Sequence, residues 1–260
     1  MSNSYELQSD CTGNDRPWLY PLWQWGVLIP LVVLITLVAA TLAVLLSLFG
    51  FKRAANLGVA ASWARSIAWL TPMRVDITGA DRIVPGTRYV VVANHQSQYD
   101  IPLVYGFSGL DLRWVMKAEL GKIPFIAQGC RAIGHIFIDR GQPDAARDTI
   151  RRAVSRLGPG TGVMFFAEGT RSRTGRLLKF RKGAFQVAVE QGMPVLPVSL
   201  VGTRRILKPG SVRVHPGRVR LVFHEPIMPP DAPTEQAVST LCVKTRAAIA
   251  SALDESQCKG

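Results

Sequence analysis

The fold of this chain is decided by an apolar run that ends in a polar cluster, Tyr89-Val90-Val91-Val92-Ala93-Asn94-His95-Gln96-Ser97-Gln98-Tyr99-Asp100. Its first five residues have the length and apolar character of a buried strand. α/β proteins place their chemistry in the crevice beyond the ends of such strands. His95 is the side chain in this cluster that exchanges a proton near neutral pH. The stretch therefore predicts an α/β fold with a site at the end of this strand.

The spacing of His95 and Asp100 limits how the two side chains can meet. On a regular helix of ~3.6 residues per turn, five residues turn the side chain about 140° beyond a full turn, so the two would point apart. They meet if His95 precedes a helix and Asp100 lies one turn inside it. A helix that begins near Ser97, with Ser97 as its N-cap, meets this condition. The carboxylate would then hold one imidazole nitrogen while the other faces a substrate. The alternative is an ordinary local hydrogen bond.

A long uncharged segment lies near the start of the chain. Residues 17–51 contain no Asp, Glu, Lys or Arg, and most of them are apolar. About 20 apolar residues cross a hydrocarbon layer of ~30 Å. The run is longer than that of a secretory signal, and mainly acidic residues precede it. We expect a membrane helix, with Lys52 and Arg53 marking its cytoplasmic end at the inner cell membrane. Pro30 leaves open a kinked or re-entrant segment.

The remaining pattern divides the chain into four parts. Residues 1–16 are polar and predicted to be disordered, and residues 17–51 form the membrane segment. A helix in residues 52–72 either lies along the membrane surface or packs on the domain. Residues 73–260 form the main domain. Its strands are expected at 74–78, 89–93, 113–116, 135–138, 163–166, 195–201 and 218–223, and its helices at 101–107, 121–131, 144–157, 184–191 and 235–253.

This alternation of strands and helices predicts an α/β domain whose mixed sheet is covered by helices. Proline lacks the N–H that a central strand donates. Because Pro194 and Pro197 fall at the start of the 195–201 run, we expect an edge strand or a bulge there.

The formal net charge is +13, and only one of the 31 basic residues precedes the apolar segment. Such a domain is attracted to nucleic acid, or to an anionic membrane surface with phosphorylated substrates. Zinc-finger spacing, an RNA-binding aromatic signature and a basic zipper are all missing from the sequence. A membrane helix favours the second interpretation. The alternative is a basic, solvated surface that binds no ligand.

Four widely spaced cysteines give no Cys-x-x-Cys pair, so the sequence predicts neither a zinc site nor a disulfide framework. His135, His215 and His224 show no metal-ligand spacing and are interpreted as structural. We expect no metal in the site.

A second polar cluster follows the apolar run at 163–166, and it contains Glu168, Gly169, Thr170 and Arg171. Glycine allows the backbone to approach a ligand closely, and the guanidinium fork suits a phosphate. A surface turn is the alternative. The basic residues 171–182 are expected to form a mobile loop over the site.

Three further cations stand beside predicted strands or helix starts: Lys117, Arg140 and Lys182. Each one alone is best explained as a surface charge whose stem covers apolar neighbours. Lys117 and Arg140 stand at strand ends beside the His95 cluster, as Arg171 does, which suggests contacts to an anion. Lys182 precedes a predicted helix start, where backbone N–H groups favour an anion.

Together these blocks resemble the 1-acylglycerol-3-phosphate acyltransferase family of glycerolipid acyltransferases. An Asn-His-x4-Asp block matches Asn94, His95 and Asp100, and a Lys-x-Glu-Leu stretch matches residues 117–120. A Gly-x-x-Phe-Ile-x-Arg block ends at Arg140. A Phe-Pro-Glu-Gly-Thr-Arg-Ser block matches residues 166–172, with Ala167 in place of the usual proline. A proline-containing fourth block matches residues 195–198, and the resemblance covers roughly 74–227.

The resemblance implies acyl transfer from acyl-CoA or acyl-carrier protein to the sn-2 hydroxyl of lysophosphatidate. His95 would be the general base and Asp100 would orient it. Substrate contacts would come from Asn94, Lys117, Arg140, Glu168, Gly169, Thr170, Arg171 and Lys182. No cofactor is implied; the partners are the two substrates and membrane lipids, with acyl-carrier protein as one possible donor and no nucleic acid.

Three alternatives stay open at this point. The acceptor can be glycerol-3-phosphate or another lysolipid, because the blocks are widely shared. The chain can be a membrane-tethered lipid-binding protein without turnover, although an intact set of His95, Asp100, Glu168 and Arg171 argues against this. Charge alone suggests a membrane-bound nucleic-acid-binding protein, which salt-sensitive duplex binding would reveal.

Overall fold

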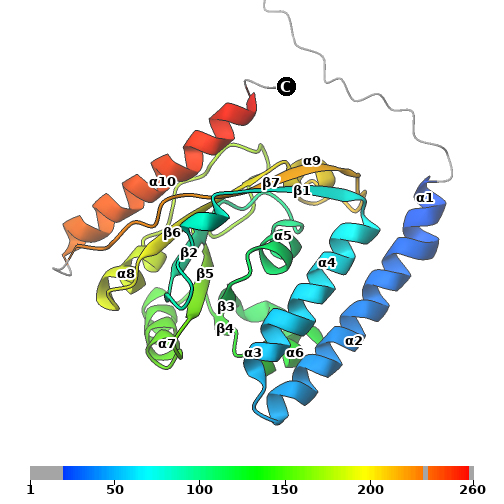
Figure 1. The fold of residues 1–260 in the computed structure, drawn as a ribbon, viewed down its shortest axis with the longest axis horizontal. Coiled ribbons are helices and arrows are strands. Elements are labelled where there is room, and N and C mark those ends of the chain that lie inside the picture. Colours follow the sequence, from blue (N-terminus) through cyan, green and yellow to red (C-terminus); the bar gives the residue numbers. More distant parts are fainter. Residues whose placement is uncertain (1–19, 231–233, 258–260) are drawn as a thin grey trace, which may run out of the picture.

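The computed structural model describes residues 20–230 and 234–257. The segment 1–16, predicted to be disordered, lies outside this part. The domain is built on a seven-stranded sheet with the order β1-β7-β6-β2-β5-β3-β4 (Figure 1). β6 and β7 are antiparallel, and all other neighbouring strands are parallel. The predicted α/β domain with a mixed sheet is therefore confirmed.

Each of the seven predicted strands is present. Their bounds are β1 Met73–Thr78, β2 Val90–Ala93, β3 Asp111–Lys117, β4 Ile136–Ile138, β5 Thr161–Phe166, β6 Val195–Val201 and β7 Gly217–Phe223. Of the two alternatives for this run, an edge strand or a bulge, the edge strand was wrong, because β6 lies between β7 and β2. Pro197 is tolerated there because antiparallel pairing with β7 starts one residue later, at Val198. The Pro197 carbonyl accepts the N–H of His224 at 3.0 Å, beyond the end of β7.

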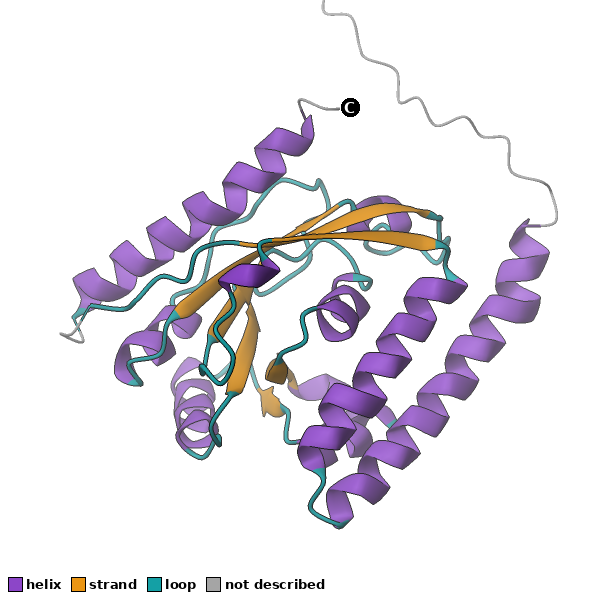
Figure 2. Cartoon of the chain, viewed as in Figure 1, coloured by secondary structure: helices purple, strands orange, loops and turns teal. Residues whose placement is uncertain are grey.

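The helices of the domain cover both faces of this sheet (Figure 2). Their bounds are α5 Asp100–Phe107, α6 Ile126–Ile133, α7 Pro143–Ser155, α8 Gly183–Glu190, α9 Thr203–Ile206 and α10 Glu235–Gln257. The predicted helix over 121–131 is interrupted. A 3-10 turn, Ala118–Lys122, ends before Pro124, and α6 starts after Phe125.

Strand β2 shows why the decisive run is apolar throughout. Val91 and Ala93 belong to a core that contains residues of α4 and α5, whereas Val90 and Val92 belong to a core shared with α7, α8 and α10. A strand that is covered on both faces has no polar side. β2 lies in the middle of the sheet, and His95 follows its last residue by two positions.

Two helical rods precede the sheet and lie side by side in Figure 1. The first comprises α1 Tyr20–Trp23, a π-helical stretch Gln24–Leu28 and α2 Ile29–Leu48, with Pro30 in the first turn of α2. The second comprises α3 Lys52–Ala54, a π-helical stretch Ala55–Ala60 and α4 Ala61–Leu70. Within the described residues, the helix Pro21–Leu48 is long and apolar enough to cross a membrane, with a mean hydropathy of 2.9.

The first rod touches the rest of the protein near its beginning and near its end. The Gln24 amide donates to the Val212 carbonyl at 2.7 Å and accepts the Val214 N–H at 3.1 Å. Farther along, the backbone of Gly129 on α6 lies so close to Ala40 that a Cβ there would stand 3.3 Å from it. The rod is therefore attached to one side of the domain along most of its length.

The second rod packs between the first rod and the domain. The Trp63 indole N–H donates to the Thr36 hydroxyl of α2 at 2.9 Å. Arg65 donates to the Gly106 carbonyl at the end of α5 at 2.7 Å. Asn56 is buried and donates to the Asp111 carboxylate at 2.6 Å. Of the two alternatives for this helix, the structure shows packing on the domain.

Candidate active site

The end of β2 is fixed by Asn94, whose side chain is completely buried. Its amide nitrogen donates to the Leu200 carbonyl at 2.9 Å, and its oxygen accepts the Leu200 N–H at 2.8 Å. This reciprocal pair joins β2 to β6 just before His95. The amide that the sequence suggested as a substrate contact is thus used inside the sheet, because the strand end needs partners for its backbone groups.

The side chains of His95 and Asp100 meet. His95 Nδ1 lies 2.7 Å from Asp100 Oδ2. The helix begins at Asp100, three residues later than expected from Ser97. The two side chains meet because residues 97–100 form a tight turn, in which the Asp100 N–H points to the Ser97 carbonyl at 3.4 Å.

Asp100 holds this turn as well as the imidazole. Its Oδ2 also accepts the backbone N–H groups of Gln96 at 2.6 Å and Ser97 at 2.8 Å. The carboxylate is completely buried, whereas 15% of the His95 side chain is exposed. When Nδ1–H donates to Asp100, Nε2 carries a lone pair, and no group in the described parts of the chain bonds to it. The arrangement suits an imidazole that accepts a proton from a bound molecule.

A stack of aromatic rings supports the imidazole from one side. The His95 ring lies on the Phe166 ring with centroids 3.8 Å apart and planes 8° apart. Phe166 in turn contacts Trp114, which stacks on Tyr105. Phe166 lies in the sequence block that spans residues 166–172, but no role was predicted for it. The ring becomes significant only because β2 and β5 pair in a register that sets Ala93 opposite Phe166.

Glu168 connects the backbone of His95 to the loop that follows β5. One carboxylate oxygen accepts the His95 N–H at 2.6 Å, and the other accepts the Leu178 N–H at 2.8 Å. Burial raises the pKa of Glu168 above that of an ordinary carboxyl, and the two N–H donors act in the opposite direction. The Glu168 carboxylate therefore bonds to two backbone N–H groups, and among the described residues it has no hydrogen bond or ion pair with Arg171.

Two guanidinium groups converge on Gly169. Its φ of +72° is one that favours glycine, and a Cβ there would lie 2.6 Å from Arg181 Nε. Arg140 donates a short hydrogen bond to the Gly169 carbonyl. Burial, followed by the charge of Arg181, lowers the pKa of Arg140, and Glu119 opposes this. Two cations held this close together suit an anionic ligand. Arg181 was not predicted as a site residue, because nothing in its local sequence distinguishes it from other loop arginines.

The loop over the site is tied down along its length. The Ser172 N–H donates to the His95 carbonyl at 2.8 Å, and the Ser172 hydroxyl donates to the Arg176 carbonyl at 2.6 Å. The Gln96 side chain donates to the Gly175 carbonyl at 3.3 Å. The guanidinium of Arg204, on α9, donates two hydrogen bonds to the Arg173 carbonyl. The loop that was predicted to be mobile is therefore anchored by hydrogen bonds to the turn that carries His95.

Thr170 and Arg171 occupy the turn between Gly169 and this loop. Thr170 is exposed, and Arg171 is half-buried. Across residues 20–230 and 234–257, no hydrogen bond or ion pair joins the Arg171 guanidinium to another side chain. Its backbone is adjacent to Ser172, whose N–H donates to the His95 carbonyl at 2.8 Å. Its suggested contact with the substrate stays a prediction.

Two predicted lysines lie farther out. Lys117 pairs with Glu119 at 2.7 Å, and about half of each side chain is exposed. Lys182 pairs with Glu235 at the start of α10 at 2.7 Å. The second pair draws Lys182 toward α10, on the face of the sheet away from α5. Their suggested contacts with phosphate groups stay predictions.

A different buried polar cluster lies between β3 and the π-helical stretch Ala55–Ala60 and has a structural role. Asp111 accepts hydrogen bonds from Arg113 and Asn56 at 2.6 Å each and from Thr161 at 3.0 Å. Nearby, Tyr105 shares a short hydrogen bond with His135, and burial lowers the pKa of His135 to about 3. His135 is therefore neutral, in keeping with its interpretation as structural.

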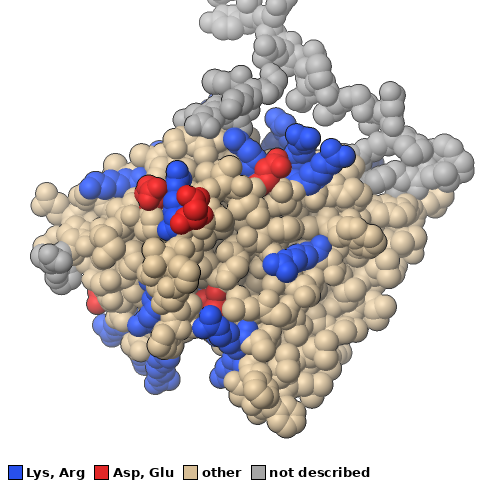
Figure 3. All heavy atoms as spheres, viewed as in Figure 1, with Lys and Arg blue, Asp and Glu red and all other residues tan. Residues whose placement is uncertain are grey.

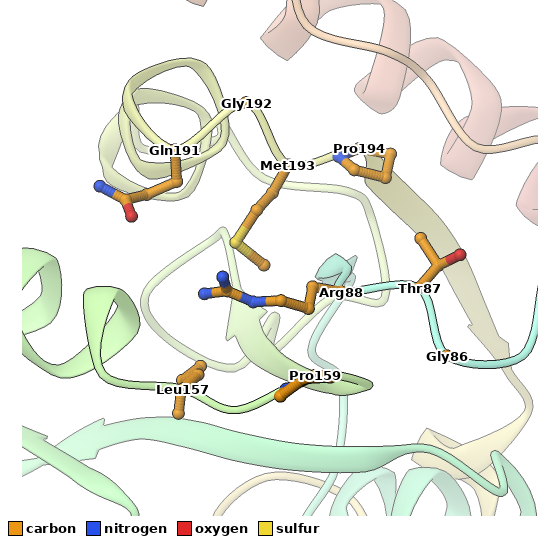
Figure 4. Close-up of a pocket in the computed structure, with 9 residues that line it drawn as sticks. All are labelled: Gly86, Thr87, Arg88, Leu157, Pro159, Gln191, Gly192, Met193 and Pro194. Carbon is orange, nitrogen blue, oxygen red and sulfur yellow. The ribbon is translucent and has the colours of Figure 1, made fainter.

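A hollow of about 440 Å³ opens at the opposite end of the sheet (Figure 4). Arg88 and Met193 lie in its wall. Arg88 precedes β2 whereas His95 follows it, so the hollow and the dyad lie at opposite ends of the same strand. Arg88 donates to the Val154 carbonyl at 2.8 Å, which explains its place there. The described residues contain no group of three or more His, Cys, Asp or Glu side chains able to hold a metal ion.

Comparison with known proteins identifies the family. Residues 74–201 match the acyltransferase family. The 1-acyl-sn-glycerol-3-phosphate acyltransferase of Pseudomonas aeruginosa is 30% identical over 202 residues, which make up 76% of this chain and 77% of that protein. The chain belongs to the 1-acyl-sn-glycerol-3-phosphate acyltransferase family. The resemblance seen in the four sequence blocks is thereby confirmed.

Plant members of the family are longer than this chain. The chloroplastic 1-acyl-sn-glycerol-3-phosphate acyltransferase of Arabidopsis thaliana is 32% identical over 84% of this chain and 62% of its own length. The chloroplastic relative from Brassica napus is 35% identical over 68% of this chain and 52% of its own length. The chain thus spans between half and two thirds of these plant relatives.

The fold is also that of a solved member of the acyltransferase family. The crystal structure of the 1-acyl-sn-glycerophosphate acyltransferase from Thermotoga maritima matches with a TM-score of 0.66 and 27% identity. The match covers 89% of this chain and 98% of that one. In this acyltransferase-family chain, Ala167 stands where the block usually has proline. The turn still closes, because the Gly169 N–H donates to the Phe166 carbonyl at 3.0 Å.

Proposed function

We propose that this chain transfers an acyl group from acyl-CoA or acyl-carrier protein to the sn-2 hydroxyl of 1-acylglycerol-3-phosphate, forming phosphatidate. The observation that carries the proposal is the His95 imidazole, with Nδ1 on the buried Asp100 carboxylate and Nε2 open to a ligand. The names of the family members in Pseudomonas and Arabidopsis support lysophosphatidate as the acceptor.

In this mechanism His95 Nε2 removes the proton of the acceptor hydroxyl as its oxygen attacks the thioester carbonyl carbon. Asp100 stabilises the imidazolium that forms. The carbon–sulfur bond then breaks, and Nε2 returns the proton to the departing thiolate, so the products are the new ester and a free thiol. A thioester has a good leaving group, so base catalysis and positioning suffice without an enzyme nucleophile.

The backbone around His95 limits where the developing oxyanion can be bound. The N–H of His95 is taken by Glu168, and those of Gln96 and Ser97 are taken by Asp100. These three N–H groups are therefore unavailable to the substrate. A hydrogen-bond donor to the oxyanion must therefore come from another segment of the chain, or from a group that moves into place when substrate binds.

The acceptor phosphate would lie among the guanidinium groups near Gly169. Arg171 follows Gly169 by two residues, and Arg140 and Arg181 converge on Gly169 itself. A guanidinium binds phosphate oxygens in a planar, two-pronged way that a lysine does not. The phosphate would thus be held on the β5 side of His95 and the glycerol hydroxyl beside Nε2.

The rods support a site at a membrane surface, because the first of them is long and apolar enough to enter a bilayer. Gln24 and Ala40 both contact the same side of the domain, so a bilayer-crossing rod would draw polar domain surface into the hydrocarbon layer. Burying unpaired polar groups there is costly. We therefore propose that the first rod lies within one leaflet, with the domain on the cytoplasmic side. The lipid substrate can then react without leaving the leaflet, which avoids ~0.8 kcal/mol for each CH₂ moved into water.

The reaction can be tested with purified full-length protein, labelled acyl-CoA and lysophosphatidate in phospholipid vesicles. We expect His95→Ala to lower turnover by ~10²–10⁴-fold, the usual range for a general base. His215→Ala, outside the site, is the matched control and should retain turnover. Near-normal turnover in His95→Ala would remove His95 from the mechanism. If the wild type is inactive with both donors and with all lyso acceptors, the chain binds lipid without turnover.

The phosphate site has its own test. Arg171→Ala should weaken use of lysophosphatidate far more than use of monoacylglycerol, which lacks the phosphate. Arg205→Ala, an exposed arginine on α9, is the control. Equal loss with both acceptors in Arg171→Ala would contradict the phosphate role.

A further inference from the structure

An exposed apolar surface extends beyond the two rods. It is formed by Leu120, Ile123, Phe125 and Ile126, whose side chains are 36%, 41%, 53% and 37% exposed. They lie in the connection between β3 and α6, where the predicted helix is interrupted. We call these four residues the 120–126 surface. Large exposed apolar patches mark sites of contact with proteins or membranes.

The backbone at Phe125 is held in an uncommon conformation that keeps its ring outside. Its φ is +62°, in the region that favours glycine. The Ile126 N–H donates to the Pro124 carbonyl at 2.7 Å, so Phe125 is the central residue of a γ-turn of the strained, positive-φ kind. A large apolar residue in a strained turn that leaves it more than half exposed points to a function for the exposed ring.

The 120–126 surface is continuous with the exposed apolar side of α2. Phe125 and Gln128 line a shallow apolar groove together with Thr41, Val44 and Leu45 of α2. Figure 3 shows the outer side formed by the first rod as a surface without charged residues. Any layer that receives the outer side of α2 therefore also meets Phe125.

The surface is rigid and has cations beside it. Arg131 donates to the Gly121 carbonyl at 2.9 Å and lies over the Phe137 ring, which holds the 3-10 turn against α6 and β4. Lys117 and Lys122 are exposed at the base of the connection. Apolar side chains with flanking lysines match the boundary between acyl chains and anionic headgroups.

From these observations we propose that the 120–126 surface inserts into the acyl layer of the same leaflet as α2 and forms a second membrane contact, independent of the rods in sequence. The proposal rests on the proposed membrane attachment of the first rod. It also orients the site, because a second contact away from the rods restricts rotation of the domain about them. The second contact would thus fix the rotation of the domain so that the guanidinium groups face the headgroups.

Depth-dependent quenching tests this inference on the full chain. The four cysteines are replaced by serine, and single cysteines are introduced as Phe125→Cys, Ile123→Cys, Leu34→Cys and Val243→Cys. Each carries an environment-sensitive fluorophore, and the vesicles contain phosphatidylethanolamine and phosphatidylglycerol with nitroxide groups on the acyl chains. Leu34 reports on the rod, and Val243, an exposed apolar residue on α10, is the matched control.

We expect strong quenching at positions 34, 123 and 125 and little at position 243. Ile123→Cys lies outside the strained residue, so it keeps the test valid if Phe125→Cys alters the turn. Quenching at 34 but not at 123 and 125 would overturn this inference alone and assign the surface to a protein partner. No quenching at 34 would overturn the proposed membrane attachment of the rod, and quenching at 243 equal to that at 125 would also refute a specific second contact.

Discussion

Replacing Asp100 with asparagine separates the charge of the carboxylate from its shape. Asp100 Oδ2 accepts hydrogen bonds from His95 Nδ1 and from two backbone N–H groups, and Oδ1 has no hydrogen-bond partner within the described residues. In Asp100→Asn, the side-chain oxygen can keep the position of Oδ2. The new NH₂ group then occupies the place of Oδ1, where it is buried without an acceptor.

The expected size of the effect follows from this geometry. An imidazolium and a carboxylate about 4 Å apart attract each other by about 4 kcal/mol at an effective dielectric constant near 20. At ~1.36 kcal/mol per tenfold change in rate, loss of that attraction predicts a turnover about 10³-fold lower. The unpaired NH₂ also lowers the free energy of unfolding by about 1–3 kcal/mol.

The assay compares turnover per folded molecule, measured with labelled acyl-CoA in vesicles, and the free energy of unfolding from urea titration. Asp111→Asn is the matched control, because Asp111 is also a buried carboxylate that accepts three hydrogen bonds. We expect both variants to be less stable but only Asp100→Asn to lose turnover. Wild-type turnover in Asp100→Asn would show that catalysis does not need the negative charge. An equal loss of turnover in both variants would show that the loss comes from lower stability.

Three further predictions follow from the neighbours of His95. Because burial raises the pKa of Glu168, its carboxyl binds a proton more tightly in the folded chain. The resulting stability is present below the unfolded pKa of ~4.3 and is lost as pH rises through the folded pKa. Urea titrations at a series of pH values should show this dependence in the wild type and its absence in Glu168→Gln; identical pH dependence would contradict it. Phe166→Leu removes the ring stacked on His95, worth ~0.5–1.5 kcal/mol, and should lower kcat several-fold with KM nearly unchanged; an unchanged kcat would show that the stack has no positioning role. Gly169→Ala forces a β-carbon into a positive-φ position, at a cost of ~1–2 kcal/mol, and displaces Arg181. Its preference for lysophosphatidate over monoacylglycerol should fall, and a preserved preference would exclude Arg181 from phosphate binding.

The sheet was predictable because both of its faces are covered. Runs such as those of β2 and β6 are apolar throughout, and glycine, proline or polar residues separate them from the helices. The wrong edge assignment of β6 came from Pro197, whose position just outside the β7 pairing cannot be read from the sequence. The break before α6 has a sequence signal in Pro124, which disfavours a helix at the residue before it. Its exact form, with Phe125 at positive φ, has no such signal.

The site was predictable where its chemistry is local. His95 and Asp100 are five residues apart, so a turn can be reasoned from their spacing. The carboxylate of Glu168, however, bonds to a backbone group 73 positions earlier, and Asn94 bonds 106 positions later. Those pairings depend on strand register, which brings distant residues together in ways that no local pattern reveals.

The Gln24 contact has a consequence for how the protein is made. Its two partners, Val212 and Val214, lie 188 and 190 positions later in the chain. The first rod therefore leaves the ribosome long before its amide can be satisfied, and at ~5–20 residues per second the interval is roughly 10–40 s. On the proposed membrane attachment, lipid can stabilise the nascent rod during that interval, so its insertion is expected to precede closure of the Gln24 contact.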